Sequence, residues 1–268
     1  MKVMKTPIVV LISAFCVLSS CNSNSEGNGS LFNIIPKEGK GPIKNKTYNL
    51  SFDEISVAQS INAEVVKSNE EKIIVTAPSD ILDDVLVEKL GEKLYIHFKP
   101  GINISTRNVA VKIFAKDFSK IEASSSADVK VKDKFTQDKT VVKVSSSATI
   151  NGEFEANDLE IDVSSSGTYN GKVWAVNLDA DVSSSGDINI SGKAKKADMD
   201  ASSSGSIDAG NMQTEVADLK ASSSGSISLV VSQALSATAN SSGSIDVSGK
   251  NIQIVSKKEN SGGSVNVR

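Results

Sequence analysis

Apolar and polar residues alternate along most of the chain after about residue 48, and the alternation recurs at a fixed interval. Each recurrence is marked by a Ser triplet, and the copies begin at Ser124, Ser145, Ser164, Ser183, Ser202 and Ser222. Two degenerate copies begin at Asn240 and Asn260, so the eight copies follow one another at intervals of 18 to 21 residues. Such a period indicates a repeat architecture in which each copy is one structural unit.

The apolar positions form three columns when the copies are placed in register. Apolar residues stand three and one before the start of each of the first seven copies, whereas Glu259 stands one before the start of the last copy. The column five residues after each start comprises Val129, Ile150, Tyr169, Ile188, Ile207, Ile227, Ile245 and Val265. Period-two alternation predicts strands with one buried face. A unit this short cannot bury its own apolar face, so the pattern predicts an all-β parallel β-helix with stacked coils.

The region before the first triplet continues this pattern less regularly, and residues 89–93 (KLGEK) are predicted to form a turn between two of its strands. The segment from Phe52 to Ser60 matches the segment from Phe118 to Ser126, an offset that we interpret as about three coils. We therefore expect a single domain over residues 48–268 with roughly eleven coils. Residues 48–120 would form irregular amino-terminal coils, and residues 121–268 would form the regular Ser-rich coils. The glycines after the triplets would adopt backbone angles closed to other residues.

The first 21 residues resemble an export signal. Residues 8–18 are mostly apolar and follow two lysines, but the stretch is too short to span a bilayer, so residues 1–20 are predicted to be a signal peptide. The sequence Leu18-Ser19-Ser20-Cys21 resembles a bacterial lipobox, which implies that Cys21 becomes lipidated; the alternative is an ordinary signal peptide with a chance cysteine. Residues 21–47 would be the lipidated cysteine and a flexible tether. This predicts a lipid-anchored protein of the cell envelope, and the expected membrane is the outer membrane. The sequence does not distinguish its periplasmic face from its surface face.

Composition and charge narrow the functional classes. The net charge of −3 gives no basic footprint for nucleic acid. His97 is the sole histidine, which excludes a His-rich metal site, and it is the sole candidate base for the many serines. We therefore predict no catalytic residues and no enzyme, and we expect His97 to be a surface or edge side chain. Trp174 is the sole tryptophan, and packing is the favoured interpretation over an exposed contact.

Two columns of acidic residues precede the triplets. They comprise Glu160, Asp179, Asp198 and Asp218 four residues before, and Asp162, Asp181 and Asp200 two residues before. Stacked coils would bring these like charges to about 5 Å. A divalent cation such as Ca²⁺ would relieve the repulsion. The favoured alternative is a solvated acidic face that is screened by salt and by nearby lysines.

A polar column follows each buried residue of the third apolar column. It comprises Asn151, Asn170, Asn189, Asp208, Ser228, Asp246 and Asn266. Side chains stacked at the strand spacing can hydrogen-bond along the rod, so a structural role is favoured over ligand binding.

The chain resembles the bacterial family described as putative autotransporter adhesin, head GIN domain, which is common among lipoproteins of the Bacteroidetes type. The resemblance rests on Phe52-Asp53-Glu54-Ile55, on the Ser-Ser-Gly corner, and on the Gly-x-Ile-Asn/Asp step, as in Gly186 to Asn189. It covers residues 48–268, although family corners often have Ser-Gly-Ser-Gly where this chain has Ser-Ser-Ser-Gly. It implies a right-handed β-helix, no known catalytic residues, a role in adhesion and trimeric assembly.

These observations predict a non-catalytic envelope lipoprotein with a β-helical binding surface. Its expected partners are the membrane, through the lipid at Cys21, a glycan or protein ligand, and further copies of the chain. The alternative is a periplasmic structural or assembly protein, and a glycan-active enzyme is third.

Overall fold

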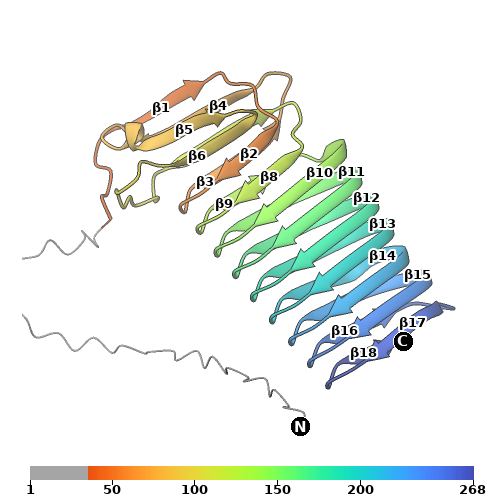
Figure 1. Ribbon diagram of the computed structural model, residues 1–268. Helices are drawn as coiled ribbons and strands as arrows, with labels where there is room; N and C mark the ends of the chain where they lie inside the picture. Colours follow the sequence, from red (N-terminus) through yellow and green to blue (C-terminus); the bar gives the residue numbers. More distant parts are fainter. Residues whose placement is uncertain (1–35) are drawn as a thin grey trace, which may run out of the picture. The chain divides into compact units, whose positions relative to one another are not determined.

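The computed structural model describes residues 36–268, which form an all-β solenoid of parallel stacked coils with about eight turns (Figure 1). The predicted fold class is confirmed, but the expected count of roughly eleven coils is too high. The predicted signal peptide, Cys21 and the first part of the tether lie outside the described residues.

The regular part of the solenoid consists of strands that pair in parallel with their counterparts one coil away. These strands are β8 (Lys120–Ala123), β9 (Asp128–Val131), β10 (Phe135–Val144), β11 (Thr149–Val163), β12 (Thr168–Val182), β13 (Asp187–Ala201), β14 (Ser206–Ala221), β15 (Ser226–Ala239), β16 (Ser244–Ser248), β17 (Gln253–Glu259) and β18 (Ser264–Val267). The register from β11 to β12 is continuous and pairs residues 19 positions apart, as in Ile150 with Tyr169. The sequence repeat is therefore one coil of the solenoid.

The amino-terminal part mixes parallel and antiparallel pairing. Its elements are β1 (Ile43–Tyr48), β2 (Glu54–Val57), β3 (Asn62–Lys67), β4 (Lys72–Pro78), the 3-10 turn η1 (Leu82–Asp84), β5 (Val85–Leu90), β6 (Lys93–Phe98) and β7 (Ala110–Ala115). Strand β5 is antiparallel to β6, and β4 is antiparallel to both β1 and β7. The antiparallel strands of this part cap the solenoid, and its parallel strands contribute further coils.

The antiparallel pairs explain why the coils are fewer than expected. Glu54 pairs directly with Lys120, so the two matching segments lie on adjacent coils, and the interpretation of their offset as about three coils is wrong. The chain leaves β3, forms the cap, and returns through β6 and β7 on the other edge of β2 and β3. Alternation of apolar residues defines a strand and its buried face but not its direction, so the sequence pattern did not reveal the reversals.

Strand β1 also changes the expected boundary of the tether. Its residues Ile43 to Tyr48 pair antiparallel with β4, although the tether was expected to continue to residue 47. The pairing is between segments about 30 residues apart, and β1 is exposed along most of its length, so it lacks a local apolar signal.

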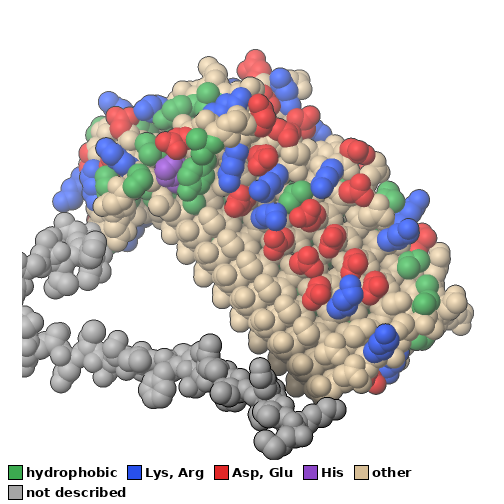
Figure 2. All heavy atoms as spheres, viewed as in Figure 1, with side chains coloured by type: hydrophobic (Ala, Val, Ile, Leu, Met, Phe, Trp, Pro, Cys, Tyr) green, Lys and Arg blue, Asp and Glu red, His purple; other side chains and the backbone are tan. Residues whose placement is uncertain are grey.

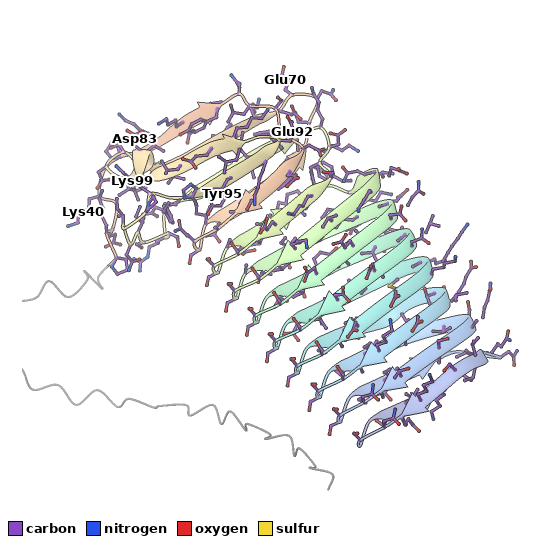
Figure 3. The ribbon with its side chains drawn as sticks, in the orientation of Figure 1. Lys40, Glu70, Asp83, Glu92, Tyr95 and Lys99 are labelled. Atoms are coloured by element: carbon purple, nitrogen blue, oxygen red, sulfur yellow. The ribbon has the colours of Figure 1, made fainter. Side chains whose placement is uncertain are left out.

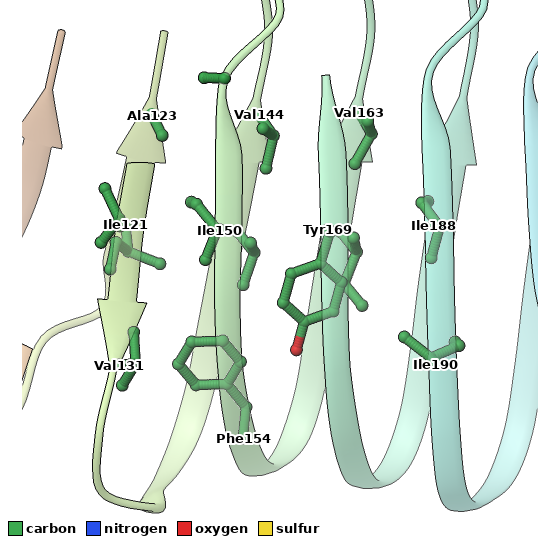
Figure 4. Close-up of a cluster of buried hydrophobic side chains, with 14 of the residues drawn as sticks. Ile121, Ala123, Val131, Val144, Ile150, Phe154, Val163, Tyr169, Ile188 and Ile190 are labelled. Atoms are coloured by element: carbon green, nitrogen blue, oxygen red, sulfur yellow. The ribbon is translucent and has the colours of Figure 1, made fainter. Parts of the chain in front are cut away.

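The core lies inside the solenoid, at the positions that the apolar columns predicted. Ile150, Tyr169 and Ile188 are fully buried on successive coils (Figure 4). Phe154 lies beside Tyr169, with ring centroids 6.2 Å apart. The described residues form one continuous hydrophobic cluster from the cap to the last coil.

The Ser triplets form the corners, and their conformation differs from the expectation. The second and third Ser of each triplet adopt the left-handed conformation, as at Ser165 (φ 50°) and Ser166 (φ 59°). The third Ser donates its backbone N–H to the second Ser of the next coil, as from Ser166 to the carbonyl oxygen of Ser184 at 3.1 Å. Both residues of each pair are exposed, and backbone hydrogen bonds form the ladder between successive corners.

The corner glycines are required for a different reason from the one expected. None of the glycines that directly follow a triplet has a left-handed φ. A Cβ at Gly225 would lie 2.2 Å from the carbonyl oxygen of Ala201, so close approach of the preceding coil restricts the side chain. Ala127 and Ala148 occupy the same position in the first two regular coils, where the backbone leaves room for a methyl group.

Candidate functional site

The two acidic columns lie side by side on one face of the solenoid, on the strand segments that lead into the Ser corners. The pairing from β11 to β14 aligns Glu160, Asp179, Asp198 and Asp218 in the first column, and Asp162, Asp181 and Asp200 in the second. Figure 2 shows these acidic side chains gathered over the middle of the solenoid, beside an uncharged strip along the corners. The sequence therefore located a surface of concentrated negative charge.

Lysines neutralise this acidic face at its two ends. The Lys143 Nζ lies 3.1 Å from the Asp162 carboxylate, and this hydrogen bond raises the pKa of Lys143. The Lys220 Nζ lies 3.5 Å from Asp198, whose negative charge raises the pKa of Lys220. Asp181, in the middle, forms no ion pair with another described residue. Burial, followed by the charges of its acidic neighbours, raises its pKa to about 6.

The acidic face has no group of ligands that would enclose a cation. Among residues 36–268, no cluster of three or more His, Cys, Asp or Glu side chains is arranged to hold a metal ion. The carboxylates form parallel rows on a sheet rather than converging on one point. Calcium binding at Glu160, Asp179 or Asp181 stays a prediction without support from this geometry.

The Asp181 carboxylate is expected to destabilise the fold at neutral pH. Its folded pKa of about 6 is above the ordinary 3.8, so the folded state binds the proton more tightly than the unfolded state. The free energy of unfolding should therefore rise as the pH falls from about 6 to about 4. Asp181→Asn should raise stability at neutral pH, because it removes a partly buried negative charge. The gain should not exceed about 1 kcal/mol, because the side chain is also partly exposed and solvent screens its repulsion from the neighbouring carboxylates.

Urea denaturation at a series of pH values checks this expectation. Asp181→Asn should show a weaker pH dependence than the natural chain, whereas the control Asp117→Asn, on an exposed loop outside the columns, should not. An unchanged pH dependence in Asp181→Asn would contradict the account.

His97 lies in the cap and is buried, whereas the sequence favoured a surface or edge position. Its Nδ1 lies 2.8 Å from the Phe98 carbonyl oxygen, and its Nε2 lies 3.2 Å from the Glu88 carboxylate. Its ring stacks on Tyr95 with centroids 4.2 Å apart (Tyr95 is labelled in Figure 3). Both ring nitrogens therefore contact groups other than a serine hydroxyl.

A second polar surface lies on the strand segments that leave the Ser corners. Asn170 donates from its Nδ2 to the Oδ1 of Asn151 at 3.1 Å, and Asn189 donates in the same way to Asn170 at 2.9 Å. Further along, Ser228 donates to Asp208 at 2.9 Å. The predicted hydrogen bonding along the rod is confirmed for these pairs.

Three shallow hollows lie in a row along this polar surface. The first, over β3, β7 and β9, shares Lys130 with the second, and the second shares Gly171 and Ser191 with the third. The second is the largest, with a volume of about 700 Å³. We call the three together the axial groove; its lining residues are Asn62, Ala63, Glu64, Thr76, Ala110, Val111, Lys112, Asp128, Lys130, Val131, Lys132, Lys134, Asn151, Gly152, Glu153, Asn170, Gly171, Lys172, Asn189, Ile190, Ser191, Asp208 and Asn211.

Two glycines set the floor of the axial groove. Gly152 and Gly171 pair across β11 and β12. A Cβ at Gly171 would lie 2.2 Å from the Tyr169 Oη, and a Cβ at Gly152 would lie 2.8 Å from the Val131 side chain. The absence of side chains at these two positions therefore makes room for the buried side chains of Tyr169 and Val131.

Trp174 lies next to the axial groove, half-buried on β12 rather than inside the core. The Lys172 Nζ lies 4.7 Å from the centroid of its ring, and the Lys134 Nζ lies 5.3 Å from it. The favoured interpretation of Trp174 as a packing residue therefore holds for only part of its surface. The groove was not predicted from the sequence, because its hollows form between side chains that come from different coils.

The parallel coils, the continuous core and the long polar faces define a β-solenoid of the adhesin-like class. The model of the family "Putative auto-transporter adhesin, head GIN domain" matches residues 51–173 and 149–251. The chain belongs to this family, as its corners and opening motif predicted. Membership makes it an adhesin-like protein of the cell envelope or cell surface.

Solved structures from Parabacteroides species share the fold. A putative adhesin from Parabacteroides merdae is 21% identical with a TM-score of 0.78, over 87% of this chain and 98% of that chain. A putative lipid binding protein from Parabacteroides distasonis is 24% identical with a TM-score of 0.80, over 87% of this chain and 100% of that chain. A putative adhesin from the same species is 24% identical with a TM-score of 0.80, over 86% and 99%. No curated protein matches the chain.

Within residues 36–268, no helix is long and apolar enough to cross a membrane.

Proposed function

We propose that the protein is a non-catalytic, lipid-anchored protein of the outer membrane whose solenoid binds a ligand in adhesion. The observation that carries this proposal is family membership over most of the solenoid, together with two long polar faces on a rigid rod. The lipobox at Leu18 to Cys21 supports the anchor, and the preceding apolar stretch supports export. Binding through a surface rather than a catalytic cleft agrees with His97 being held by Phe98 and Glu88.

Protease shaving and antibody labelling of intact cells test the proposal. Adhesion requires that the solenoid is labelled and cleaved without permeabilising the outer membrane. Labelling only after permeabilisation would overturn adhesion and support the alternative of a periplasmic structural or assembly protein. Release of reducing sugars from envelope or host glycans would overturn the non-catalytic part.

Cys21→Ser is expected to abolish membrane anchoring. The thiol is the group that would carry the lipid, and a single cysteine provides the attachment, so its loss should move the protein from the membrane fraction to the soluble fraction. Labelling with an alkyne fatty acid followed by fractionation measures both effects. Cys16→Ser, within the predicted signal peptide, is the matched control and should leave labelling and fractionation unchanged. Persistent labelling of Cys21→Ser would contradict the lipobox assignment.

A further inference from the structure

The three hollows of the axial groove follow one another along the solenoid, over a length sufficient for a linear polymer. The groove crosses the neighbouring strands β7, β3, β9, β11, β12, β13 and β14 in turn. Six intervals at the usual strand spacing of about 4.8 Å give a length of about 29 Å. A ligand that follows it would meet an equivalent row of polar groups at each coil.

The floor of the groove offers hydrogen bonds rather than apolar pockets. Asn170 uses one N–H and one oxygen lone pair within the ladder, which leaves a second N–H and a second lone pair for a ligand. Glu153 and Ser191 add an acceptor and a hydroxyl beside the ladder. Repeated donors and acceptors at one spacing suit the hydroxyl and ring-oxygen groups of a sugar chain.

The central hollow is rich in positive charge although the whole chain is acidic. Four lysines and a single carboxylate, that of Glu153, line it: Lys130, Lys132, Lys134 and Lys172. The first three form ion pairs with Asp128 and Glu64, which line the first hollow, and with Glu155, which lies outside the groove lining. Each of these three lysine side chains is about half exposed, so it can still contact a ligand.

Lys172 differs from the other three lysines. It forms no ion pair with a carboxylate among residues 36–268, and its Nζ is held 4.7 Å from the Trp174 ring. An ammonium placed over an aromatic ring keeps its charge and a defined position without a neutralising partner. It is therefore the group in the groove best placed to bind an anionic substituent.

A peptide is a weaker match to the same surface. Peptides that bind to sheets usually add a strand at a free edge. Strands β9, β11, β12 and β13 are each paired on both edges, so the groove offers no such edge. Few aromatic side chains line the groove, which disfavours the base stacking used for single-stranded nucleic acid.

We propose that the axial groove binds a linear polysaccharide that carries carboxylate groups, with Lys172 contacting a carboxylate and the Asn151–Asn170–Asn189 ladder contacting sugar hydroxyls. This assignment rests on the proposed function, because it names the ligand class of the adhesive surface. Trp174 is a positioning residue that holds Lys172, and it also offers an apolar surface to a sugar ring at the margin of the groove.

Calorimetric titration of the detergent-solubilised mature lipoprotein tests the proposal. The probes are hexamers of galacturonate, of mannuronate and of hyaluronan, with a neutral glucan hexamer and a glutamate hexamer for comparison. At least one uronate-containing hexamer should bind, and the neutral glucan should bind about tenfold more weakly or not at all. Absence of binding by all three uronate hexamers overturns the proposal, as does equal binding of the neutral glucan. Equal binding of the glutamate hexamer also overturns it, because it indicates general attraction of anions.

Variants locate the binding on the groove. Lys172→Ala should weaken uronate binding by about tenfold, and Lys172→Arg should restore most of it, because charge is kept at the same place. Lys139→Ala, on the acidic face, is the matched control and should bind as the natural chain does. Equal affinity in Lys172→Ala and the natural chain would overturn the site, provided that thermal melting shows both to be folded.

Surface labelling separates this proposal from the adhesion proposal. Labelled protein on intact cells that binds none of the uronate hexamers would retain adhesion and reject the groove ligand. Uronate binding by a protein found only in the periplasm would retain the groove ligand and reject adhesion.

Discussion

Tyr169→Ala is expected to lower the free energy of unfolding by about 3–5 kcal/mol, as large aromatic deletions in packed cores do. Tyr169 is fully buried inside the solenoid. Its ring stacks against that of Phe154, with the two ring centroids 6.2 Å apart. Its Oη donates to the carbonyl oxygen of Gly152 at 3.1 Å. The alanine would leave a cavity above Gly171, which has no side chain to fill it.

Tyr169→Phe separates the ring from the hydroxyl. It keeps the packing and removes one hydrogen bond to a buried carbonyl, so it should cost about 1–2 kcal/mol. Burial and the negative charge of Glu153 raise the pKa of Tyr169 well above its usual value, so the hydroxyl remains a donor across the accessible pH range. Urea denaturation followed by circular dichroism measures both variants. A Phe variant as unstable as the Ala variant would show that the hydrogen bond, and not the packing, dominates.

The regular coils were predictable because one local rule governs them. A strand buries alternate residues, so the spacing of Ile188 and Ile207 at one position of successive repeats identified the core without knowledge of the corners. The same rule placed Asp162, Asp181 and Asp200 in one row on the outside. Wherever adjacent coils have the same length, residues that lie one repeat apart in the sequence lie next to each other in space.

The cap was not predictable in this way, because strand direction is set by pairing between distant segments. Gly91, in a left-handed conformation, turns the chain between β5 and β6, and the turn was visible in the sequence. The pairing that follows the turn was not visible in the sequence. Strand β6 pairs in parallel with β2 on one side and antiparallel with β5 on the other. Alternating apolar residues look the same in both kinds of pairing.

The candidate site was predictable only in part. The amide ladder of Asn151, Asn170 and Asn189 followed from the repeat alone, and its hydrogen bonds are present. The axial groove was not predicted, because its hollows form between side chains that come from different coils. Gly152 and Gly171 occupy one position of successive repeats, but their role in making room for Tyr169 and Val131 depends on side chains of neighbouring coils.

Gly225→Ala is expected to lower the free energy of unfolding by about 2–3 kcal/mol through overpacking. A Cβ at Gly225 would lie 2.2 Å from the carbonyl oxygen of Ala201 and 2.5 Å from its carbonyl carbon. These are backbone atoms of the preceding coil, so they can move only if the two coils separate. That separation would stretch the hydrogen bond from the Ser222 N–H to the same carbonyl oxygen, now 2.9 Å long.

Gly186→Ala is the matched control, since it changes the same corner position two coils away. Its nearest contact would be the Val163 side chain at 3.0 Å, which can move by a small rotation. We expect its stability to stay within about 1 kcal/mol of the natural chain, because alanine also restricts the unfolded state. If backbone conformation were the reason for these glycines, both variants would lose stability alike. A difference that follows the contact distances in urea denaturation would instead establish that packing of one coil against the next selects glycine at the corner.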